Sequence, residues 1–429
     1  MQFIGYWSVD IVSEKISDDV RDRVIEKTIE IIQKHYAFPE KGAQISGFIQ
    51  ERMDSGRYSD FKTVSEFLSS FNKDLNEASQ DLHLVVFHSP DAVIRYKEKP
   101  EKEDPDGWYK HFQMDNFGLV KAEYLAGNVG YLDIRVFAPL LQAKDAAIDM
   151  MRYISNCDAL IIDVRNCGGG DPHLVQLFES YFFDERPKLL LTLYYRDSDS
   201  YEQIRTIPHL PGKKLPTTPL YILTSKRTFS GAEDFSYGLK HHGRATIIGE
   251  TTGGGAHTID EKVVHDDFII HIPTGYPTHP ETGANWEGTG VEPHISVPEN
   301  DALGIAHAHA IESLIERSSD EGKIKRLKYQ LDRLKGIYSP IAISKKTLSK
   351  YVGTYGSYYV KFRNSRLVVF SNRDERIQWN LTPLNEALFA IEDDDYNVRF
   401  DVDKSGNTVS LVFLHWSQEK ENPIKKTES

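Results

Sequence analysis

Ser230 stands where a nucleophile could act. Leu220–Thr224 is an apolar run typical of a buried strand, and Ser230 follows it at the start of a helical pattern. A serine in that place lies beside free backbone amides and the positive end of the helix dipole, which would stabilise an oxyanion. The same serine could simply cap the helix, because Ser230-Gly-Ala-Glu233 is a capping box. Position alone leaves both interpretations open.

A second apolar run ends in a row of glycines. Ala159–Val164 is typical of a buried strand, and it leads into Gly168–Gly170. Three consecutive glycines allow unusual backbone dihedrals, so their N–H groups can point at one anionic atom. A plain flexible turn explains them equally well, and neither GxxxxGK[ST] nor GxGxxG is matched, which disfavours a phosphate site. We interpret Cys167 as a small residue at the strand end rather than as a nucleophile.

One histidine and one glutamate complete the set of candidate residues. His83 lies in Asp81–His88, a short run that we predict to be a strand. Glu287 lies in Asn285–His294, where glycines surround the acidic side chain, and Thr251–His257 is a similar glycine-rich segment. Taken alone, His83 is more often a satisfied or half-exposed histidine than a base, and an exposed turn would explain Glu287.

Two histidine pairs raise the question of a metal site. They are His241-His242 and His307-Ala-His309, both in helical patterns. Adjacent positions and positions two apart point to different faces of a helix, so neither pair places two imidazoles on one ion. We therefore expect no metal and no cofactor.

The elements that would position these residues begin with a mostly helical region, residues 1–105. Ile25, Ile29 and Ile32 recur near the 3.6-residue period of a helix. Thr63–Glu66 is a capping box that predicts the start of another helix. The first domain is therefore expected to be built mainly from helices.

Two further domains are predicted after a charged, proline-containing loop at 97–107. In residues 106–340, apolar runs alternate with helical patterns, which indicates an α/β core with buried strands. In residues 341–429 the apolar period switches to two, which predicts a small antiparallel β domain. The predicted fold class is thus α/β, with a helical N-terminal domain and a small antiparallel C-terminal β domain.

Composition excludes several classes of protein. The 429 residues carry 64 Asp and Glu against 51 Lys and Arg, a net charge of -13, so nucleic acid is not an expected partner. No apolar run reaches about 18 residues, so no membrane span is expected. The N-terminus has no basic segment followed by an apolar one, which predicts no signal peptide in this chain. The compartment stays undecided: it is cytoplasmic or, if a signal was removed, periplasmic or extracellular. Cys157 and Cys167 flank a predicted strand, too far apart for a disulfide.

The order of these motifs resembles peptidase family S41. The likeness is carried by Asp81-Leu-His-Leu, Asp163-Val-Arg-Asn-Cys-Gly-Gly-Gly, Phe229-Ser-Gly-Ala-Glu-Asp-Phe, Gly249-Glu-Thr-Thr-Gly-Gly-Gly-Ala-His and Asn285-Trp-Glu-Gly-Thr-Gly-Val-Glu-Pro. Within that family the chain looks like the branch that contains interphotoreceptor retinoid-binding protein repeats and the tricorn core protease. The resemblance implies a ClpP/crotonase-like core.

The resemblance also implies roles for the candidate residues. Ser230 would attack a peptide carbonyl, His83 would act as its base, and Glu287 would be the acidic residue associated with the histidine. Tail-specific proteases of the family instead use a Ser-Lys dyad, with the lysine in a Gly-Lys-Gly context. This chain has Gly253–Gly255 there, so a histidine-based site is expected.

Two expectations about neighbouring groups follow from the same resemblance. Backbone N–H groups of Gly168 or Gly169, together with that of Gly231, would form the oxyanion hole. The PDZ module typical of tail-specific proteases is absent, because too few residues separate the predicted helical domain from the core.

The expected function is a soluble serine peptidase that needs no cofactor and acts on a peptide or protein substrate, either as an endopeptidase or in carboxy-terminal processing. The alternative is a non-catalytic binding protein for a small apolar ligand on the same fold. A scaffolding role of residues 341–429 is a further alternative. A homo-oligomer and a dependence of the site on domain closure are left open.

Overall fold

The computed structural model describes residues 14–98, 112–339, 341–364, 366–374, 376–392, 394–418 and 421–427. The chain forms two compact units. The first contains Met1–Glu123 and Gly130–Glu299, and the second contains Tyr124–Val129 and Asn300–Ser429. The loop predicted at 97–107 lies almost wholly outside the described residues.

Three helices form the N-terminal part of the first unit. They are α1 (Asp18–His35), α2 (Pro39–Asp54) and α3 (Val64–Ser79). The isoleucines that predict α1 are buried on one face of it. The predicted capping box of α3 is also present, because the Thr63 side chain accepts from the Glu66 amide and Glu66 returns to the Thr63 amide.

Helix α2 begins at Pro39, although a proline at the end of the run Lys34–Pro39 predicts a break in the preceding helical pattern. Pro39 occupies its first turn, where a missing N–H removes no hydrogen bond, and Phe38 precedes it in an extended conformation. The proline therefore starts one helix as well as ending the helical pattern before it. The break signal around Pro39 does not by itself predict α2.

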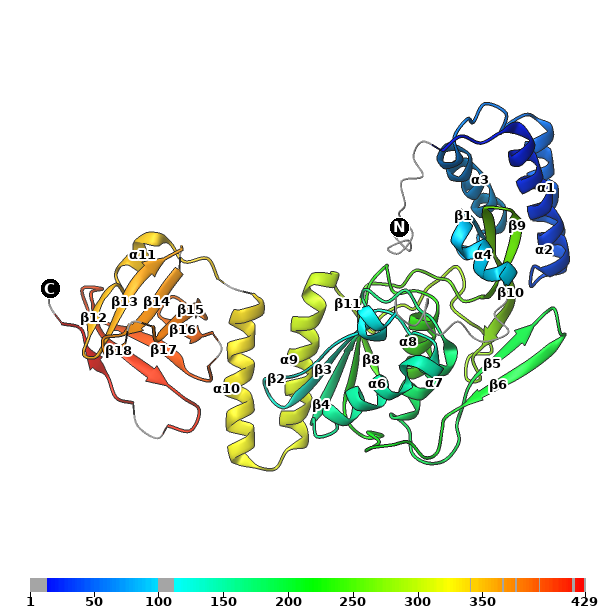
Figure 1. The fold of residues 1–429 in the computed structure, drawn as a ribbon. Coiled ribbons are helices and arrows are strands. Elements are labelled where there is room, and N and C mark those ends of the chain that lie inside the picture. The colour runs from blue at the N-terminus through cyan, green and yellow to red at the C-terminus, as the bar shows by residue number, and fades with distance from the viewer. Residues whose placement is uncertain are drawn as a thin grey trace. The chain divides into compact units, whose positions relative to one another are not determined.

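An antiparallel sheet joins these helices to the rest of the first unit. Its strands are β1 (Val85–His88), β5 (Leu189–Tyr195), β6 (Ser200–Arg205), β9 (Thr258–His265) and β10 (Phe268–Thr278), and a short helix, α4 (Pro90–Glu98), follows β1. The long strand β10 pairs with β1 near its start, with β5 near its end and with β9 along most of its length. Helices α1 and α3 lie beside β1, β9 and β10 (Figure 1), and the two groups share one hydrophobic core.

A six-stranded sheet forms the centre of the first unit, in the order β11-β8-β7-β4-β3-β2. Its strands are β2 (Leu119–Leu125), β3 (Val129–Ile134), β4 (Ala159–Asp163), β7 (Leu220–Thr224), β8 (Thr246–Gly249) and β11 (Ile295–Ser296). Four of these strands are adjacent and parallel, in the order β11, β8, β7 and β4. Strands β4 and β7 are buried at every residue, as their continuous apolar runs predict.

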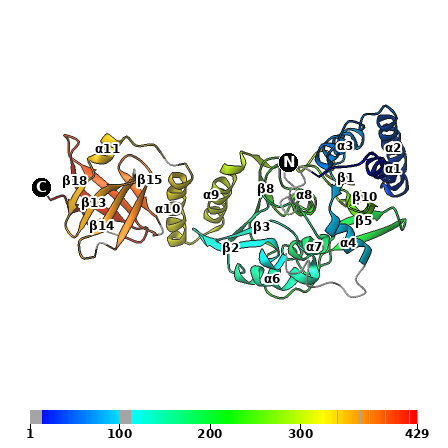
Figure 2. The same ribbon diagram turned by 45° about the horizontal axis from the view of Figure 1, so that its top comes forward.

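Three helices and one short 3-10 turn accompany this sheet. They are η2 (Asn116–Gly118), α6 (Leu140–Tyr153), α7 (Pro172–Ser180) and α8 (Gly231–His241). Helices α6 and α7 lie next to each other over the sheet (Figure 2), and α7 packs against α8. Phe178 of α7, Phe235 of α8 and Ile162 of β4 meet in the same core. This packing fixes the start of α8, where Ser230 lies.

The second unit consists of helices followed by an antiparallel sheet. Its helices are α9 (Glu299–Arg317), α10 (Glu321–Tyr338) and α11 (Lys345–Ser349). The sheet follows the chain order through β12 (Gly353–Tyr355), β13 (Tyr358–Arg363), β14 (Arg366–Ser371), β15 (Gln378–Pro383), β16 (Leu388–Ile391), β17 (Asn397–Val402), β18 (Thr408–Leu414) and β19 (Ile424–Lys425). The predicted fold class is confirmed: an α/β core with a helical N-terminal region and an antiparallel C-terminal domain. Within the described ranges, no helix has both the length and the apolar composition needed to cross a bilayer.

Candidate active site

The loops that follow three parallel strands meet at one edge of the six-stranded sheet. Strands β4, β7 and β8 are parallel, so their carboxyl ends share that edge, where open α/β sheets usually carry their ligands. Backbone hydrogen bonds join the three loops. The Phe229 amide donates to the Cys167 carbonyl oxygen at 3.1 Å, and the Gly253 amide donates to the Thr228 carbonyl oxygen at 2.9 Å.

Ser230 begins α8 in a backbone conformation that residues other than glycine rarely adopt. Its φ is 52° and its ψ is -121°, and such a conformation persists only where the surroundings enforce it. The Ser230 amide donates to the Glu233 carboxylate at 2.9 Å. The Glu233 amide donates to the Ser230 carbonyl oxygen at 2.7 Å. Because that amide already has a backbone acceptor, the serine hydroxyl is not required as a helix cap.

Gly169 brings the glycine turn after β4 against Ser230. Its φ is +102°, and a β-carbon on it would lie 2.7 Å from the Gly231 nitrogen and 2.8 Å from the Ser230 β-carbon. Only glycine fits this close approach. The Gly168 amide donates to the Arg135 carbonyl oxygen at 3.3 Å. Of the three glycines expected to form an oxyanion hole, Gly169 and Gly231 lie beside Ser230. The Gly168 amide is bonded to Arg135, and the Gly169 backbone is hydrogen-bonded to the Cys167 thiol.

Cys167 is buried beneath this turn. Burial raises the pKa of its thiol to about 12, so the thiol stays protonated at neutral pH and is a poor nucleophile. Cys157 and Cys167 are both free thiols. The interpretation of Cys167 as a small residue at a strand end agrees with this position.

Glu233 ties the serine to the glycine-rich loop after β8. Its buried carboxylate accepts from the Thr252 hydroxyl at 2.5 Å, the Gly254 amide at 2.7 Å and the Gly255 amide at 2.8 Å. Burial raises the pKa of Glu233 to about 7, although these hydrogen bonds act in the opposite direction. A single carboxylate thus fixes Ser230 and the loop relative to each other.

His83 reaches the core from the N-terminal helices. It lies in a turn before β1, so the predicted strand at 81–88 is present only over Val85–His88. The reason is local: Asp81 Oδ1 accepts the His83 amide at 2.9 Å, and this side-chain turn replaces strand pairing. The His83 ring lies 4.7 Å from the Phe229 ring, centroid to centroid. His83 therefore contacts the residue directly before Ser230.

The His83 imidazole is 8% exposed. Within the described part of the chain, neither of its ring nitrogens has a hydrogen-bond partner. Burial lowers the pKa of His83 to about 4, opposed by the charge of Asp81. The imidazole is therefore neutral at physiological pH and can accept a proton.

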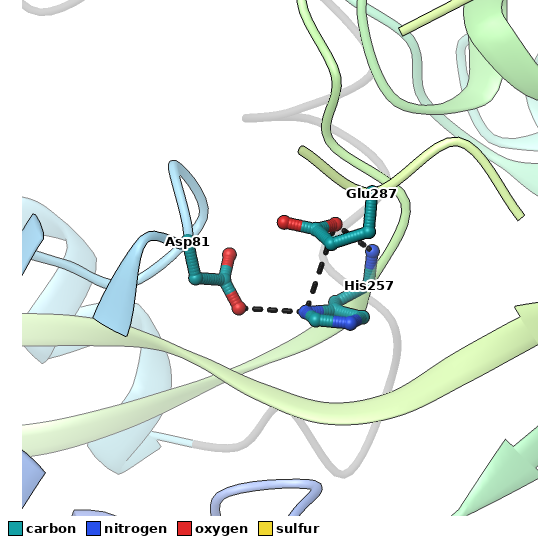
Figure 3. A group of neighbouring side chains, drawn as sticks. All are labelled: Asp81, His257 and Glu287. Carbon is teal, nitrogen blue, oxygen red and sulfur yellow. Dashed lines mark hydrogen bonds and ion pairs between the residues drawn. The ribbon is translucent and has the colours of Figure 1, made fainter. Parts of the chain in front are cut away.

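Asp81, His257 and Glu287 form a second group of polar side chains next to His83. Figure 3 shows both carboxylates joined by dashed lines to the His257 imidazole. Its Nδ1 atom lies 2.6 Å from Asp81 Oδ2 and 3.7 Å from Glu287 Oε2. Glu287 Oε2 also accepts from the Ala256 amide at 2.6 Å and the His257 amide at 3.3 Å. Glu287 thus contacts the loop and His257. Asp81 faces the His83 ring, with its Oδ1 atom 3.8 Å from Nδ1.

The three groups shift one another's pKa values. Burial acts to lower the pKa of His257, but its hydrogen bond to Asp81 and the charges of Asp81 and Glu287 prevail, so the pKa is raised. Burial acts to raise the pKa of Asp81, but the hydrogen bond and charge of His257 prevail and lower it. Burial and the charge of Asp81 raise the pKa of Glu287. Ionisation of Asp81 and protonation of His257 therefore favour each other.

The same three side chains could also hold a metal ion. One ligand atom from each of Asp81, His257 and Glu287 lies within 4.8 Å of the others, and an imidazole with two carboxylates suits several divalent metals. The His257 nitrogen and an Asp81 oxygen are already bonded to each other at 2.6 Å, so an ion would have to replace that hydrogen bond. An ion pair describes the observed geometry.

His257, Asp81 and Glu233 were not among the residues expected to act. Asp81 and His257 belong to motifs that carry the family likeness, but their spacing of 176 residues gives no sign that they meet. Glu233 carries a sequence signal, the capping box, which predicts its bond to the Ser230 amide. Its bonds to the loop after β8 depend on the tertiary fold.

Sequence comparison gives the family. The model of peptidase family S41 matches residues 128–297. A second model, described as the N-terminal domain of Peptidase_S41 in eukaryotic IRBP, matches residues 19–116. Together the two models cover the parallel core and the helices that supply His83. The chain belongs to peptidase family S41, as the order of its motifs indicates.

Three solved structures are among those similar to this chain. A lipoprotein from Streptococcus agalactiae is similar at 14% identity with a TM-score of 0.46, over 72% of this chain and 100% of that chain. The photosystem II D1 C-terminal processing protease is similar at 12% identity with a TM-score of 0.42, over 66% and 94%. The tricorn protease is similar at 14% identity with a TM-score of 0.43, over 69% of this chain and 37% of that chain.

Proposed function

We propose that the protein is a serine peptidase in which Ser230 is the nucleophile and His83 is its general base. The observation that carries the proposal is the strained backbone of Ser230 at the start of α8, held between the glycine turn at Gly169 and the Phe229–His83 contact. Membership of a peptidase family supports a peptide or protein as substrate.

The proposed reaction uses these residues as follows. His83 accepts the hydroxyl proton of Ser230 while the serine oxygen bonds to the peptide carbonyl carbon and the carbonyl electron pair moves to its oxygen. The amides of Gly169 and Gly231 stabilise that oxyanion. Collapse of the intermediate breaks the C–N bond, and His83 gives its proton to the leaving amine. Water then releases the acyl group by the same proton exchange.

Glu287 has an indirect place in this proposal. Its carboxylate accepts the Ala256 amide at 2.6 Å, and the preceding residue, Gly255, lies against the His83 ring. Glu287 therefore anchors the backbone that supports the imidazole.

Covalent labelling tests the proposal without knowledge of the natural substrate. A fluorophosphonate that reacts with activated serines should modify the full chain at Ser230, as mapped by mass spectrometry. Labelling should be lost in Ser230→Ala and should fall by at least about a hundredfold in His83→Ala. Ser236→Ala is the matched control, because Ser236 lies on the same helix and donates to the Ala232 carbonyl oxygen at 2.8 Å. Labelling elsewhere, or equal labelling of His83→Ala, would contradict the proposal.

The alternative, a carrier of a small apolar ligand, finds no support in the cavity beside α8. That cavity has a volume of about 410 Å³. An apolar ligand requires mostly apolar walls. Charged, hydroxyl and imidazole side chains instead contribute much of the lining, which consists of Tyr237, Lys240, His241, Thr251, Thr289, Gly290, Val291 and Glu292.

A further inference from the structure

We propose that protonated His257 is a positioning residue, which holds the segment carrying His83 in place against the core. The inference rests on the proposed function, since it concerns how the base of that reaction is placed. His257 does not contact Ser230 in this proposal, and it acts through Asp81.

A short series of hydrogen bonds connects His257 to His83. His257 Nδ1 bonds to Asp81 Oδ2 at 2.6 Å, and Asp81 Oδ1 accepts the His83 amide at 2.9 Å. The side chains of His257 and Asp81 are only 8% and 2% exposed. A buried charge pair with good geometry is strongly directional, and removal of one partner leaves the other charge unpaired. The position of the His83 backbone therefore depends on His257.

Glu287 connects His257 to the loop that contacts the His83 ring. Glu287 Oε2 lies 3.7 Å from His257 Nδ1 and bonds to the amides of Ala256 and His257. Gly255, which precedes Ala256, lies against the His83 ring. One positive charge on His257 thus holds two carboxylates, one bonded to the His83 backbone and one bonded to the loop that the His83 ring contacts.

Tyr36 and His83 also face this group of charges. The Tyr36 hydroxyl donates to Asp81 Oδ2 at 3.0 Å, and His83 Nδ1 lies 3.8 Å from Asp81 Oδ1. The ring of Phe38, which carries no charge, packs on the imidazole with a centroid distance of 5.3 Å. Loss of the His257 proton would leave two carboxylates facing each other, and their repulsion would separate the segments that they anchor.

The proposal requires His83 to be neutral and His257 to be protonated at the same pH. Burial lowers the pKa of His83 to about 4, so this base is neutral above that pH. The pKa of His257 is raised above its usual value, because Asp81 and Glu287 outweigh the effect of burial. We therefore expect the reaction of Ser230 to weaken as the pH rises through the pKa of His257.

The test is the pH profile of fluorophosphonate labelling of Ser230 in the full chain. The wild type should lose labelling rate on the alkaline side of the usual histidine pKa. His257→Gln, which keeps a donor but has no titrating charge, should label roughly tenfold to a hundredfold more slowly near neutral pH and should lack this alkaline decline. His35→Gln is the matched control, because His35 Nδ1 bonds to Asp197 at 2.8 Å and His35 is not part of the group formed by Asp81, His257 and Glu287. It should keep the wild-type profile.

Every outcome decides the inference. A slower His257→Gln protein with an unchanged alkaline decline would overturn it, and so would complete loss of labelling at every pH, which would make His257 the base itself. If His257→Gln does not fold, Glu287→Gln decides: losing one of the two carboxylates should move the alkaline decline to lower pH, and an unmoved decline would contradict the inference. A wild type that is not labelled at Ser230 at any pH would instead refute the proposed function, and the inference with it.

Discussion

Gly255 lies directly under His83: a β-carbon on Gly255 would stand 2.7 Å from the Cε1 atom of the imidazole. Real β-carbons do not approach other heavy atoms that closely, so glycine is needed for the ring to lie where it does. The contact has functional meaning because the Gly255 amide also bonds to Glu233 at 2.8 Å, and Glu233 bonds to the amide of Ser230. The proposed base and nucleophile therefore depend on the same loop.

Gly255→Ala should both slow the labelling of Ser230 and lower the stability of the protein. The added methyl group would overlap the Phe229 ring and press on His83, displacing the base at a cost of about 1–3 kcal/mol in the free energy of unfolding. The labelling rate of Ser230 should fall by roughly a hundredfold. Gly47→Ala in α2 is the control: no atom lies within 4 Å of the added carbon, and the helix should gain about 0.5–1 kcal/mol. If Ser230 were labelled equally fast in Gly255→Ala and Gly47→Ala, the contact between Gly255 and His83 would not position the base.

Ser230→Gly should be more stable than Ser230→Ala. With φ of 52° and ψ of -121° at this position, alanine keeps the backbone strain and glycine removes it. We expect a difference of about 1 kcal/mol in the free energy of unfolding, measured by urea denaturation. Both variants should lose peptidase activity. Equal stability of the two variants would show that Ser230 is not strained.

Glu233→Gln should disturb the site although Glu233 does not contact substrate in the proposed reaction. Each carboxylate oxygen accepts two hydrogen bonds, and an amide nitrogen in place of either oxygen leaves two buried donors without an acceptor. We expect a loss of about 1–3 kcal/mol in the free energy of unfolding, together with slower labelling of Ser230.

Glu66→Gln is the matched control for that variant. Glu66 also accepts a hydrogen bond from the amide of its helix cap, at 3.3 Å, but it is exposed. Its replacement should therefore change the free energy of unfolding by less than about 1 kcal/mol. Unfolding in urea and the labelling rate check both variants. A Glu233→Gln protein that behaves like Glu66→Gln would exclude the proposed role of the carboxylate in fixing the loop.

The buried His83 should make stability depend on pH in acid. Its pKa is lowered to about 4 by burial, whereas an unfolded histidine titrates near 6.5. Between these values the unfolded chain binds more protons, so His83 destabilises the fold progressively as the pH falls through this window. As the pH falls from about 7 to about 4, the wild type should therefore lose unfolding free energy relative to His83→Gln. A difference that does not change with pH would show that His83 is not buried in its neutral form. The labelling rate of Ser230 should also decline toward pH 4.

Local patterns predict much of the fold. The spacing of Ile25, Ile29 and Ile32 identifies α1, the capping box at Thr63 identifies the start of α3, and the continuous apolar runs identify β4 and β7. These signals are local because helix periodicity, caps and buried strands each depend on neighbours in sequence. The position of Ser230 at the start of a helix follows for the same reason.

The remainder depends on contacts that sequence spacing does not encode. Pro39 starts α2, and only the packing of that helix distinguishes it from a plain break. The side chain of Asp81 turns the chain at His83, where alternation predicts a strand. The pairing of Asp81 with His257 joins positions 176 residues apart. Such a contact is a product of the whole tertiary fold, and the family likeness assigns it no role.

Strand β10 bonds to β1 near one end and to β5 near the other. One uninterrupted strand thus packs in the hydrophobic core of the N-terminal helices and also pairs with β5, which follows α7 in the chain. Heating or denaturant should therefore melt these helices and the parallel core in a single cooperative transition, and catalytic competence should vanish together with helical structure rather than before it.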